Sequence, residues 1–321
     1  MAESIQVFPS DEIVESIIKP LVYIGIIFLA IALKQAGVFG KDDYRILSRI
    51  VMNITLPLTV VHVCVGFRPE PSMYWLVLIG FLCALLPMLT AFVVLRKKEA
   101  GLRAFGMINS AGGNIGAFIL PIVQVFYGAA GAVSCSMYDI GNALVMAGGG
   151  YAATCALLHL NQGGQKGIWH TVGGFLKNVV TSVTFDAYFI MLLLMACHVR
   201  LPEILGTVTA PFAEANAFVA MFMVGLMFQP QKDREKIKAA FQTIGIRVGT
   251  AAVLALVIYY TLPVEPKIRQ IAALCAFAPV GTLAPVFTEK SGGDGALASF
   301  LNSITVFISF FILLILVDTI F

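Results

Sequence analysis

Charged side chains are scarce in this sequence: Lys, Arg, Asp and Glu make up 12% of its 321 residues, whereas 59% are hydrophobic. A typical soluble domain is about 25% charged. So few charges cannot cover the apolar surface of a water-soluble protein of this size. The shortage also excludes intrinsic disorder and a nucleic-acid partner. The composition predicts an all-α protein that crosses a membrane several times and contacts lipid.

Catalytic and metal-binding patterns are missing as well. The four histidines are scattered, and the six cysteines contain no CxxC pair. The chain has no HExxH, no GxxxxGK[ST] phosphate loop and no GxSxG elbow. We therefore expect no enzyme activity, no metal site and no ATP-driven pump. The only cofactor that we expect is a coupling ion, H⁺ or Na⁺.

What the sequence does contain is a series of apolar segments, each long enough for a helix that crosses the bilayer. Ten are predicted, over residues 14–37, 43–66, 73–95, 103–128, 131–158, 170–197, 203–228, 236–262, 267–290 and 294–320. Ten spans define two sides, and Lys and Arg divide between them sixteen to five. Basic loops stay in the cytoplasm. We therefore expect the plasma (inner) membrane, with both termini on the extracytoplasmic side.

The chain repeats itself at an offset of 164 residues, where residues 121–132 align with residues 285–296. Four of the twelve aligned pairs are identical, one Pro, two Gly and one Ala. Both segments lie at the border between the fourth and fifth span of their half. We therefore predict two five-helix repeats, over 1–160 and 161–321. Because five is odd, the second repeat enters the membrane upside down, which is typical of secondary transporters.

Glycines and prolines interrupt the fourth and ninth spans at corresponding places. They are Gly112, Gly113, Gly116 and Pro121 in the fourth span, and Pro279, Gly281 and Pro285 in the ninth. Such residues break a helix within the membrane. The amino-terminal ends of the resulting half-helices carry partial positive charge, which suits a carboxylate. A helix-packing role for these glycines, with the prolines as simple kinks, is the alternative.

Several motifs resemble those of one transporter family. Asn53-Ile-Thr-Leu-Pro57 is similar to the NxTLP signature of the auxin efflux carriers, and Asn114 precedes Pro121 by seven residues, as in their first crossover. Pro285 with the Gly-rich turn that follows looks like the second crossover. The chain is thus identified as a member of that family, within the bile/arsenite/riboflavin transporter superfamily. It is most similar to prokaryotic members described as malate or malonate transporters.

The resemblance implies a fold and a mechanism. Broken helices 4 and 9 cross, as in bile acid transporters and in NhaA, and a transport part moves against a scaffold by elevator-type alternating access, often in a homodimer. The substrates are small organic anions such as dicarboxylates or aromatic carboxylates. The plant carriers have a long loop between spans 5 and 6, which here is only residues 161–170. A microbial metabolite is therefore expected rather than a plant hormone.

Polar residues inside predicted spans are the candidate site, because charges at that depth are costly and usually functional. The candidate substrate-binding residues are Asn53, Asn114, Ile115, Gly116, Pro121, Asp139, Asn142, Gly281, Thr282 and Pro285. The candidate coupling residues are Asn109, Asp139, Asp186, Glu214 and Glu289. Arg247 is expected near the cytoplasmic end of its span with its head group in the interface. No basic side chain is then left in mid-membrane to pair with a carboxylate.

Two other functions stay open. The first is a Na⁺-coupled symporter of organic anions resembling bile acid transporters, with oxygen ligands among Asn109, Ser110, Asn114, Thr282 and Glu289. The second is a membrane sensor that binds a ligand without moving it. A sensor usually carries a signalling domain, and this sequence contains no such segment.

Overall fold

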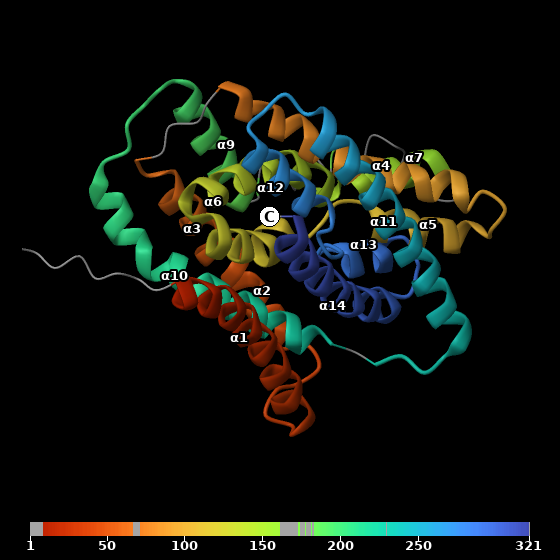
Figure 1. The fold of residues 1–321 in the computed structure, drawn as a ribbon. Coiled ribbons are helices and arrows are strands. Elements are labelled where there is room, and N and C mark those ends of the chain that lie inside the picture. Colours follow the sequence, from red (N-terminus) through yellow and green to blue (C-terminus); the bar gives the residue numbers. More distant parts are fainter. Residues whose placement is uncertain are drawn as a thin grey trace, which may run out of the picture.

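The computed structural model describes residues 9–66, 71–160, 183–228 and 230–320, together with Gly173, Lys177 and Thr181. Within these residues every regular element is a helix (Figure 1). The α-helices are α1 (Pro9–Gln35), α2 (Tyr44–Ile50), α3 (Leu56–Cys64), α4 (Trp75–Val94), α5 (Ala100–Ser110), α6 (Leu120–Leu144), α7 (Gly150–Leu158), α9 (Val183–Ala196), α10 (Glu203–Met227), α11 (Arg234–Thr261), α12 (Pro266–Ala276), α13 (Ala284–Lys290) and α14 (Gly295–Ile320). Short π-helical segments join some of them: η1 (Val51–Thr55), η3 (Ile115–Ile119) and η4 (Val145–Gly149). A 3-10 turn, η2 (Pro71–Tyr74), precedes α4.

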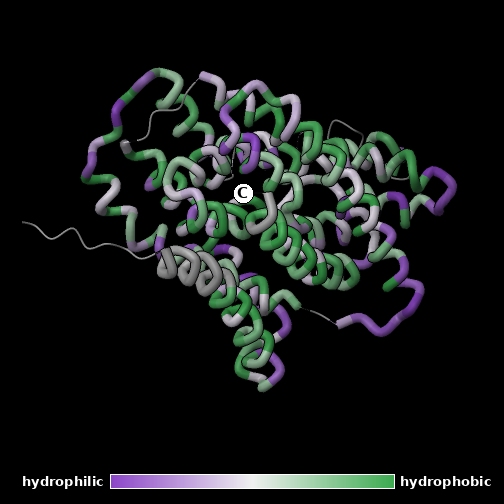
Figure 2. Tube along the Cα trace, in the orientation of Figure 1, coloured by the Kyte–Doolittle hydropathy of each residue, from purple (hydrophilic) through white to green (hydrophobic). Residues whose placement is uncertain are grey.

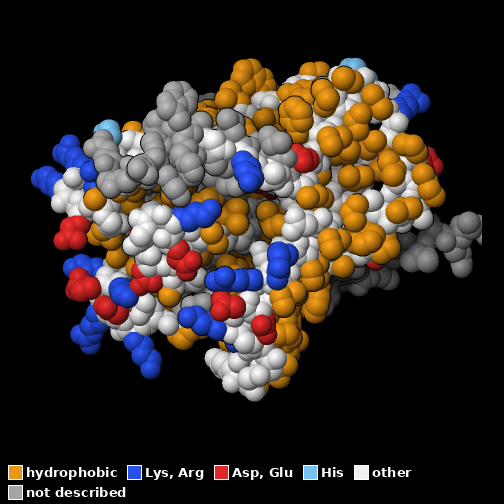
Figure 3. Space-filling view, turned by 180° about the vertical axis from the view of Figure 1, so that it is seen from behind, with side chains coloured by type: hydrophobic (Ala, Val, Ile, Leu, Met, Phe, Trp, Pro, Cys, Tyr) orange, Lys and Arg blue, Asp and Glu red, His pale blue; other side chains and the backbone are white. Residues whose placement is uncertain are grey.

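The helices are those of a protein that crosses a membrane several times. Six helical stretches in the described residues are long and apolar enough to span a bilayer, and two further apolar helices are shorter. Hydrophobic residues run along most of the helices, and hydrophilic residues gather at their ends and in the loops (Figure 2). From behind, most charged side chains lie toward one side, and a broad hydrophobic area covers the other (Figure 3). A broad area of hydrophobic side chains of this kind suits contact with the hydrocarbon layer.

Two of the predicted spans are divided in the structure. The predicted span 103–128 consists of α5, a non-helical stretch at residues 111–114, and then η3 with the first part of α6. The predicted span 267–290 consists of α12, an irregular stretch at 277–283, and α13. The predicted border between the fourth and fifth spans falls at Gly128, whose φ of 63° interrupts α6. The predicted loop 161–170 and the start of the sixth span lie outside the described residues.

Proline stands where the second broken helix begins and where it resumes. Pro266 and Pro285 lie in the first turn of α12 and α13. The first N–H groups of a helix have no partner within it, so a proline there loses no hydrogen bond. Pro57 and Pro121 instead lie inside continuous helices, directly after the π-helical segments η1 and η3, where the missing N–H and the ring interrupt the regular α-helical hydrogen bonding.

The helices pack in two groups. In the first, α10 lies against α1, α2 and α3, and α9 packs on α3. Lys34 in α1 joins this group by donating to the carbonyl oxygens of Leu226 and Phe228 at 2.5 and 2.9 Å, which closes the end of α10. The second group contains α4, α5, α6 and α7 with α11 to α14, so it holds both broken helices. Figure 1 shows α1 beside α10 at the lower left, and α4, α5 and α11 toward the right.

Candidate functional site

The first break, at residues 111–114, has a partner for each of its backbone N–H groups. Gly112 N–H donates to the carbonyl oxygen of Ala84 in α4 at 2.9 Å. Gly113 is held in both directions by Asn142: its N–H donates to Oδ1, and its carbonyl oxygen accepts from Nδ2, each at 2.8 Å. Unpaired backbone groups are very costly away from water. The side chain of Asn142 thus makes this open backbone tolerable within a helix bundle.

The second break meets the first directly. Asn114 N–H donates to the carbonyl oxygen of Pro279 at 2.9 Å, which joins the two interrupted helices at their irregular stretches. Helix α14 holds the second break much as α6 holds the first. Val280 N–H donates to Oγ1 of Thr305 at 3.1 Å, and the Gly281 carbonyl oxygen accepts from Nδ2 of Asn302 at 3.4 Å. For each break, a helix that follows it in the chain therefore supplies the side chains that stabilise it.

Arg247 lies between the two breaks, which corrects its expected place in the interface. Its side chain is 7% exposed. One terminal nitrogen donates to the carbonyl oxygens of Asn109 and Ser110 at 3.4 and 3.0 Å, and the other to those of Ala278 and Pro279 at 2.9 and 3.1 Å. The expectation that no basic side chain lies in mid-membrane was therefore wrong. Arg247 lies on the side of α11 that packs against the broken helices. Its guanidinium therefore binds buried carbonyl oxygens instead of water at the membrane interface.

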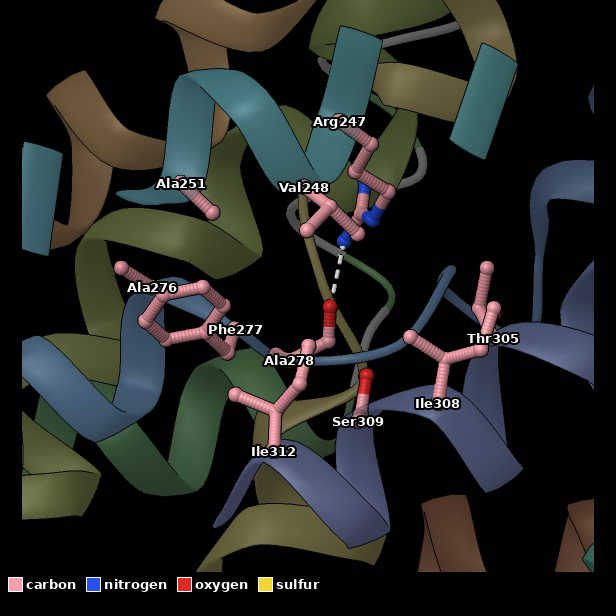
Figure 4. Close-up of a pocket in the computed structure, with 10 residues that line it drawn as sticks. All are labelled: Arg247, Val248, Ala251, Ala276, Phe277, Ala278, Thr305, Ile308, Ser309 and Ile312. Atoms are coloured by element: carbon pink, nitrogen blue, oxygen red, sulfur yellow. Dashed lines mark hydrogen bonds between the residues drawn. The ribbon is translucent and has the colours of Figure 1, made fainter. Parts of the chain in front are cut away.

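A small pocket lies next to this guanidinium, between α11, α12 and α14 (Figure 4). Figure 4 shows Arg247 reaching toward the carbonyl oxygen of Ala278, with Thr305 and Ser309 on the α14 side. Its cavity volume is about 10 Å³, about the space that one water molecule needs. Ligand sites typically have about 300–1,000 Å³. In this conformation the pocket beside Arg247 is therefore too small for an organic anion.

Asp139 lies on the other side of the first break. It and Arg247 are the two ionisable side chains of Asp, Glu, Lys and Arg that are buried in the described residues. Its carboxylate accepts from Oη of Tyr188 in α9 at 2.6 Å and from Nδ2 of Asn142 at 2.7 Å. The Gly116 N–H also donates to it. Three donors hold this carboxylate at the start of the second half-helix, where the helix dipole favours a negative charge.

Met146, in η4, fills the space between the two breaks. A Cβ on Gly112 would come within 2.7 Å of its Sδ, and a Cβ on Gly281 would overlap its terminal methyl group. Gly112 also has a φ of 65°, which side chains rarely adopt. Glycine is therefore required at position 112 by its backbone conformation, whereas a Cβ at Gly281 would have to displace the flexible end of the Met146 side chain.

Three buried polar atoms at the breaks have no hydrogen-bond partner among the described residues. They are Oδ1 of Asn109, Oγ of Ser110 and Nδ2 of Asn114. Asn109 and Ser110 are fully buried, and Asn114 is 6% exposed. Unsatisfied buried polar groups are rare in native structures and often mark a functional site. These three lie within six residues of one another on the broken helix.

The structure brings together several of the predicted site residues. Asn109, Asn114, Ile115, Gly116, Pro121, Asp139, Asn142, Gly281 and Pro285 are buried at the breaks or in the half-helices that flank them, and Thr282 is half-buried in the second break. The others lie apart. Asn53 is exposed and donates to the Arg49 carbonyl oxygen at 2.8 Å. Asp186 and Glu214 are exposed on α9 and α10, and Glu289 is exposed at the end of α13. In the described part of the chain, no three His, Cys, Asp or Glu side chains gather as metal ligands would.

Four residues at this site were not among the sequence candidates: Tyr188, Arg247, Asn302 and Thr305. Arg247 carried a usable signal, because it is a single charge inside the apolar run Ile244–Leu256. Tyr188 and Thr305 carried none, since isolated hydroxyls are common in membrane helices.

The site belongs to a chain with recognisable relatives. Residues 13–163 match the family model described as membrane transport protein. The chain is also 24% identical, over 293 residues, to an uncharacterized transporter of Methanothermobacter thermautotrophicus, an alignment that covers 89% of this chain and 91% of the relative. These matches agree with the motifs that resemble the auxin efflux carriers. The chain is therefore similar to the membrane transport protein family over residues 13–163, and its described residues include six helical stretches with the length and composition of membrane spans.

Proposed function

We propose that this protein is a secondary transporter that carries small organic anions, either dicarboxylates or other carboxylates, and binds them at the crossing of the broken helices. The observation that carries the proposal is the amide of Asn114. Its Nδ2 is buried in the first break without a partner among the described residues. A buried unpaired donor costs about 1–3 kcal/mol, and a carboxylate would satisfy it. The positive ends of the resuming half-helices favour the same ligand.

The movement that we propose is elevator-like, between two inverted repeats at 1–160 and 161–321. Two features support it. The breaks occupy corresponding places in the two halves, and each is held by the helix that follows it. In addition, both broken helices belong to one packing group, while α1, α3, α9 and α10 form the other. A part that carries the site and a part that stays in place are what such a mechanism requires.

The setting that we propose is the plasma membrane, with both termini outside and a homodimer as the working unit. The unequal distribution of Lys and Arg supports the orientation. The dimer rests on the family resemblance alone. Asp139 is the coupling residue that we favour, because it is the acidic side chain buried beside the break.

Sodium-coupled symport is the second candidate. It is favoured by the two unpartnered oxygens, Oδ1 of Asn109 and Oγ of Ser110, since oxygen atoms are the ligands of hard cations. Against it, the guanidinium of Arg247 lies on the carbonyl oxygen of Ser110 and would repel a cation there. Glu289 lies at the end of α13 with an exposed side chain.

Thermal unfolding of the purified protein with malonate, succinate and indole-3-acetate tests both candidates. A ligand at about 100 times its Kd stabilises by about 2.7 kcal/mol. We expect a stabilisation that does not need Na⁺, and Asn114→Ala should weaken the Kd by about 10–100-fold, because it removes a hydrogen bond to a charged group worth about 1.5–3 kcal/mol. The cysteines Cys64, Cys135, Cys155 and Cys275 are buried, so a thiol-reactive dye reports unfolding.

Gln124→Ala is the control, because it removes an amide of the same broken helix that is half-buried and outside the break. It should leave the Kd unchanged. Equal affinity in wild type and Asn114→Ala would remove the crossing as the binding site. Stabilisation only with Na⁺ would favour the symporter, and binding without uptake into proteoliposomes would favour a sensor.

A further inference from the structure

Arg247 is the buried cation at the crossing, and its partners are unusual. The four carbonyl oxygens that it contacts belong to Asn109, Ser110, Ala278 and Pro279. The first two end α5, and the last two follow the end of α12 in the second break. One side chain thus joins the carboxyl ends of the two half-helices that precede the breaks.

The carboxyl end of a helix carries about −0.5 elementary charge, and the amino end about +0.5. At the crossing, two carboxyl ends converge on Arg247, and η3 and α13 resume a few residues later. Without the guanidinium, the two negative ends would offset the two positive ends. With it, the negative ends are neutralised, and the positive ends that follow are left to act on a ligand.

Among the described residues, no carboxylate forms an ion pair with Arg247; the ion pairs found there are Arg45 with Asp42 and Lys236 with Asp294. A buried guanidinium without an anion is costly. Gly113 in the first break lies close to it, since a Cβ added there would come within 3.2 Å of the guanidinium. The charge therefore lies directly against the backbone that precedes Asn114.

We propose that Arg247 is a positioning residue for the anion: it fixes the carboxyl ends of α5 and α12, cancels their negative charge, and so makes the crossing selective for a negatively charged ligand. This inference rests on the proposed function, because it presumes that the crossing binds an organic anion. It adds that the preference of this site for a negatively charged ligand comes from Arg247, which need not touch the ligand.

The test compares Arg247→Gln, which removes the charge, with Arg247→Lys, which keeps it. The probes are malonate, succinate and indole-3-acetate, each beside the compound in which one carboxylate is replaced by a carboxamide. For each acid that stabilises the wild type, the ratio of the two Kd values measures selectivity for charge. Asp139 is present in every variant, so its effect cancels in the comparison.

We expect the selectivity for carboxylate over carboxamide to fall about tenfold in Arg247→Gln, which corresponds to ~1.4 kcal/mol, and to stay within about threefold of wild type in Arg247→Lys. Both variants should unfold at lower temperature, because neither replaces all four hydrogen bonds. Lys238→Gln is the matched control: it removes a charge from the same helix at an exposed position, and it should change neither quantity.

Unchanged selectivity in Arg247→Gln would overturn the inference. A tenfold loss of selectivity in Arg247→Lys would also overturn it. If Arg247→Gln does not fold, the result for Arg247→Lys is sufficient by itself. A wild-type protein that binds none of the three acids would instead remove the proposed function, and this inference with it.

Discussion

Gly141→Ala is expected to destabilise the protein by about 1–3 kcal/mol or more, which would lower its unfolding temperature by about 2–12 °C. In the structure, α4 and α6 approach each other at backbone distance. A Cβ on Gly141 would overlap the carbonyl oxygen of Val77 and reach the Phe81 nitrogen at 2.5 Å. Gly80, on the facing helix, meets the Tyr138 carbonyl oxygen in the same way. Neither neighbour can move aside, because both are main chain.

The same substitution should reduce transport. Helix α4 supplies the Ala84 carbonyl oxygen that binds the Gly112 N–H in the first break. An added methyl group at Gly141 would push α4 away from α6. The Ala84 carbonyl oxygen would then move away from the Gly112 N–H, and this hydrogen bond would be lost. Small residues permit such close packing in membranes, where the apolar lipid gives no hydrophobic drive to hold helices together.

Gly245→Ala is the control for this prediction. Gly245 lies in a helix, α11, and a Cβ there would meet nothing within 4 Å. The change should be neutral or slightly stabilising, because alanine favours the helix over glycine by about 1 kcal/mol. Unfolding of purified protein in detergent, followed with a thiol-reactive dye, separates the two variants. Equal unfolding temperatures would mean that the α4–α6 contact is looser than described.

Asn142→Leu is expected to destabilise the protein by about 2–6 kcal/mol and to abolish transport. The substitution leaves both the N–H and the carbonyl group of Gly113 buried without a partner, each at about 1–3 kcal/mol. It also removes one of the three donors to Asp139. The backbone at the break would then lose the shape that presents Asn114.

Asn302→Leu is the matched control in the other half, with the same change of side chain on the helix that follows the second break. Asn302 makes one long contact of 3.4 Å to the Gly281 carbonyl oxygen. We therefore expect its loss of stability to be well below that of Asn142→Leu. The reverse order, measured by thermal unfolding in detergent, would show that the second break depends more on side-chain support than the first.

The broken helices could be predicted from particular residues. Glycines at 112 and 113 and prolines at 121, 279 and 285 act on the backbone locally, through a missing Cβ or a missing N–H. Both interruptions are found in the structure, at 111–114 and 277–283. The pair Asp139 and Asn142 was visible too, since residues three apart share a face of a helix.

The roles of the individual side chains could not be predicted in this way. Asp139 and Asn142 were identified as a pair, but that Asn142 holds Gly113 depends on how α6 lies against the break. Arg247 was expected in the membrane interface because the sequence placed it near the cytoplasmic end of its predicted span. Its burial depends on carbonyl oxygens at the ends of α5 and α12, which lie 137 and 31 residues away in the chain.

The sequence by itself thus determined the helical, membrane-spanning character of this protein and where its helices break, because composition, apolar run length and Gly or Pro act within a few residues. Only the tertiary structure decided which groups satisfy the broken backbone. Asn142, Thr305 and Arg247 reach it from three different helices. Such long-range hydrogen bonds depend on the packing of whole helices, which no local pattern records.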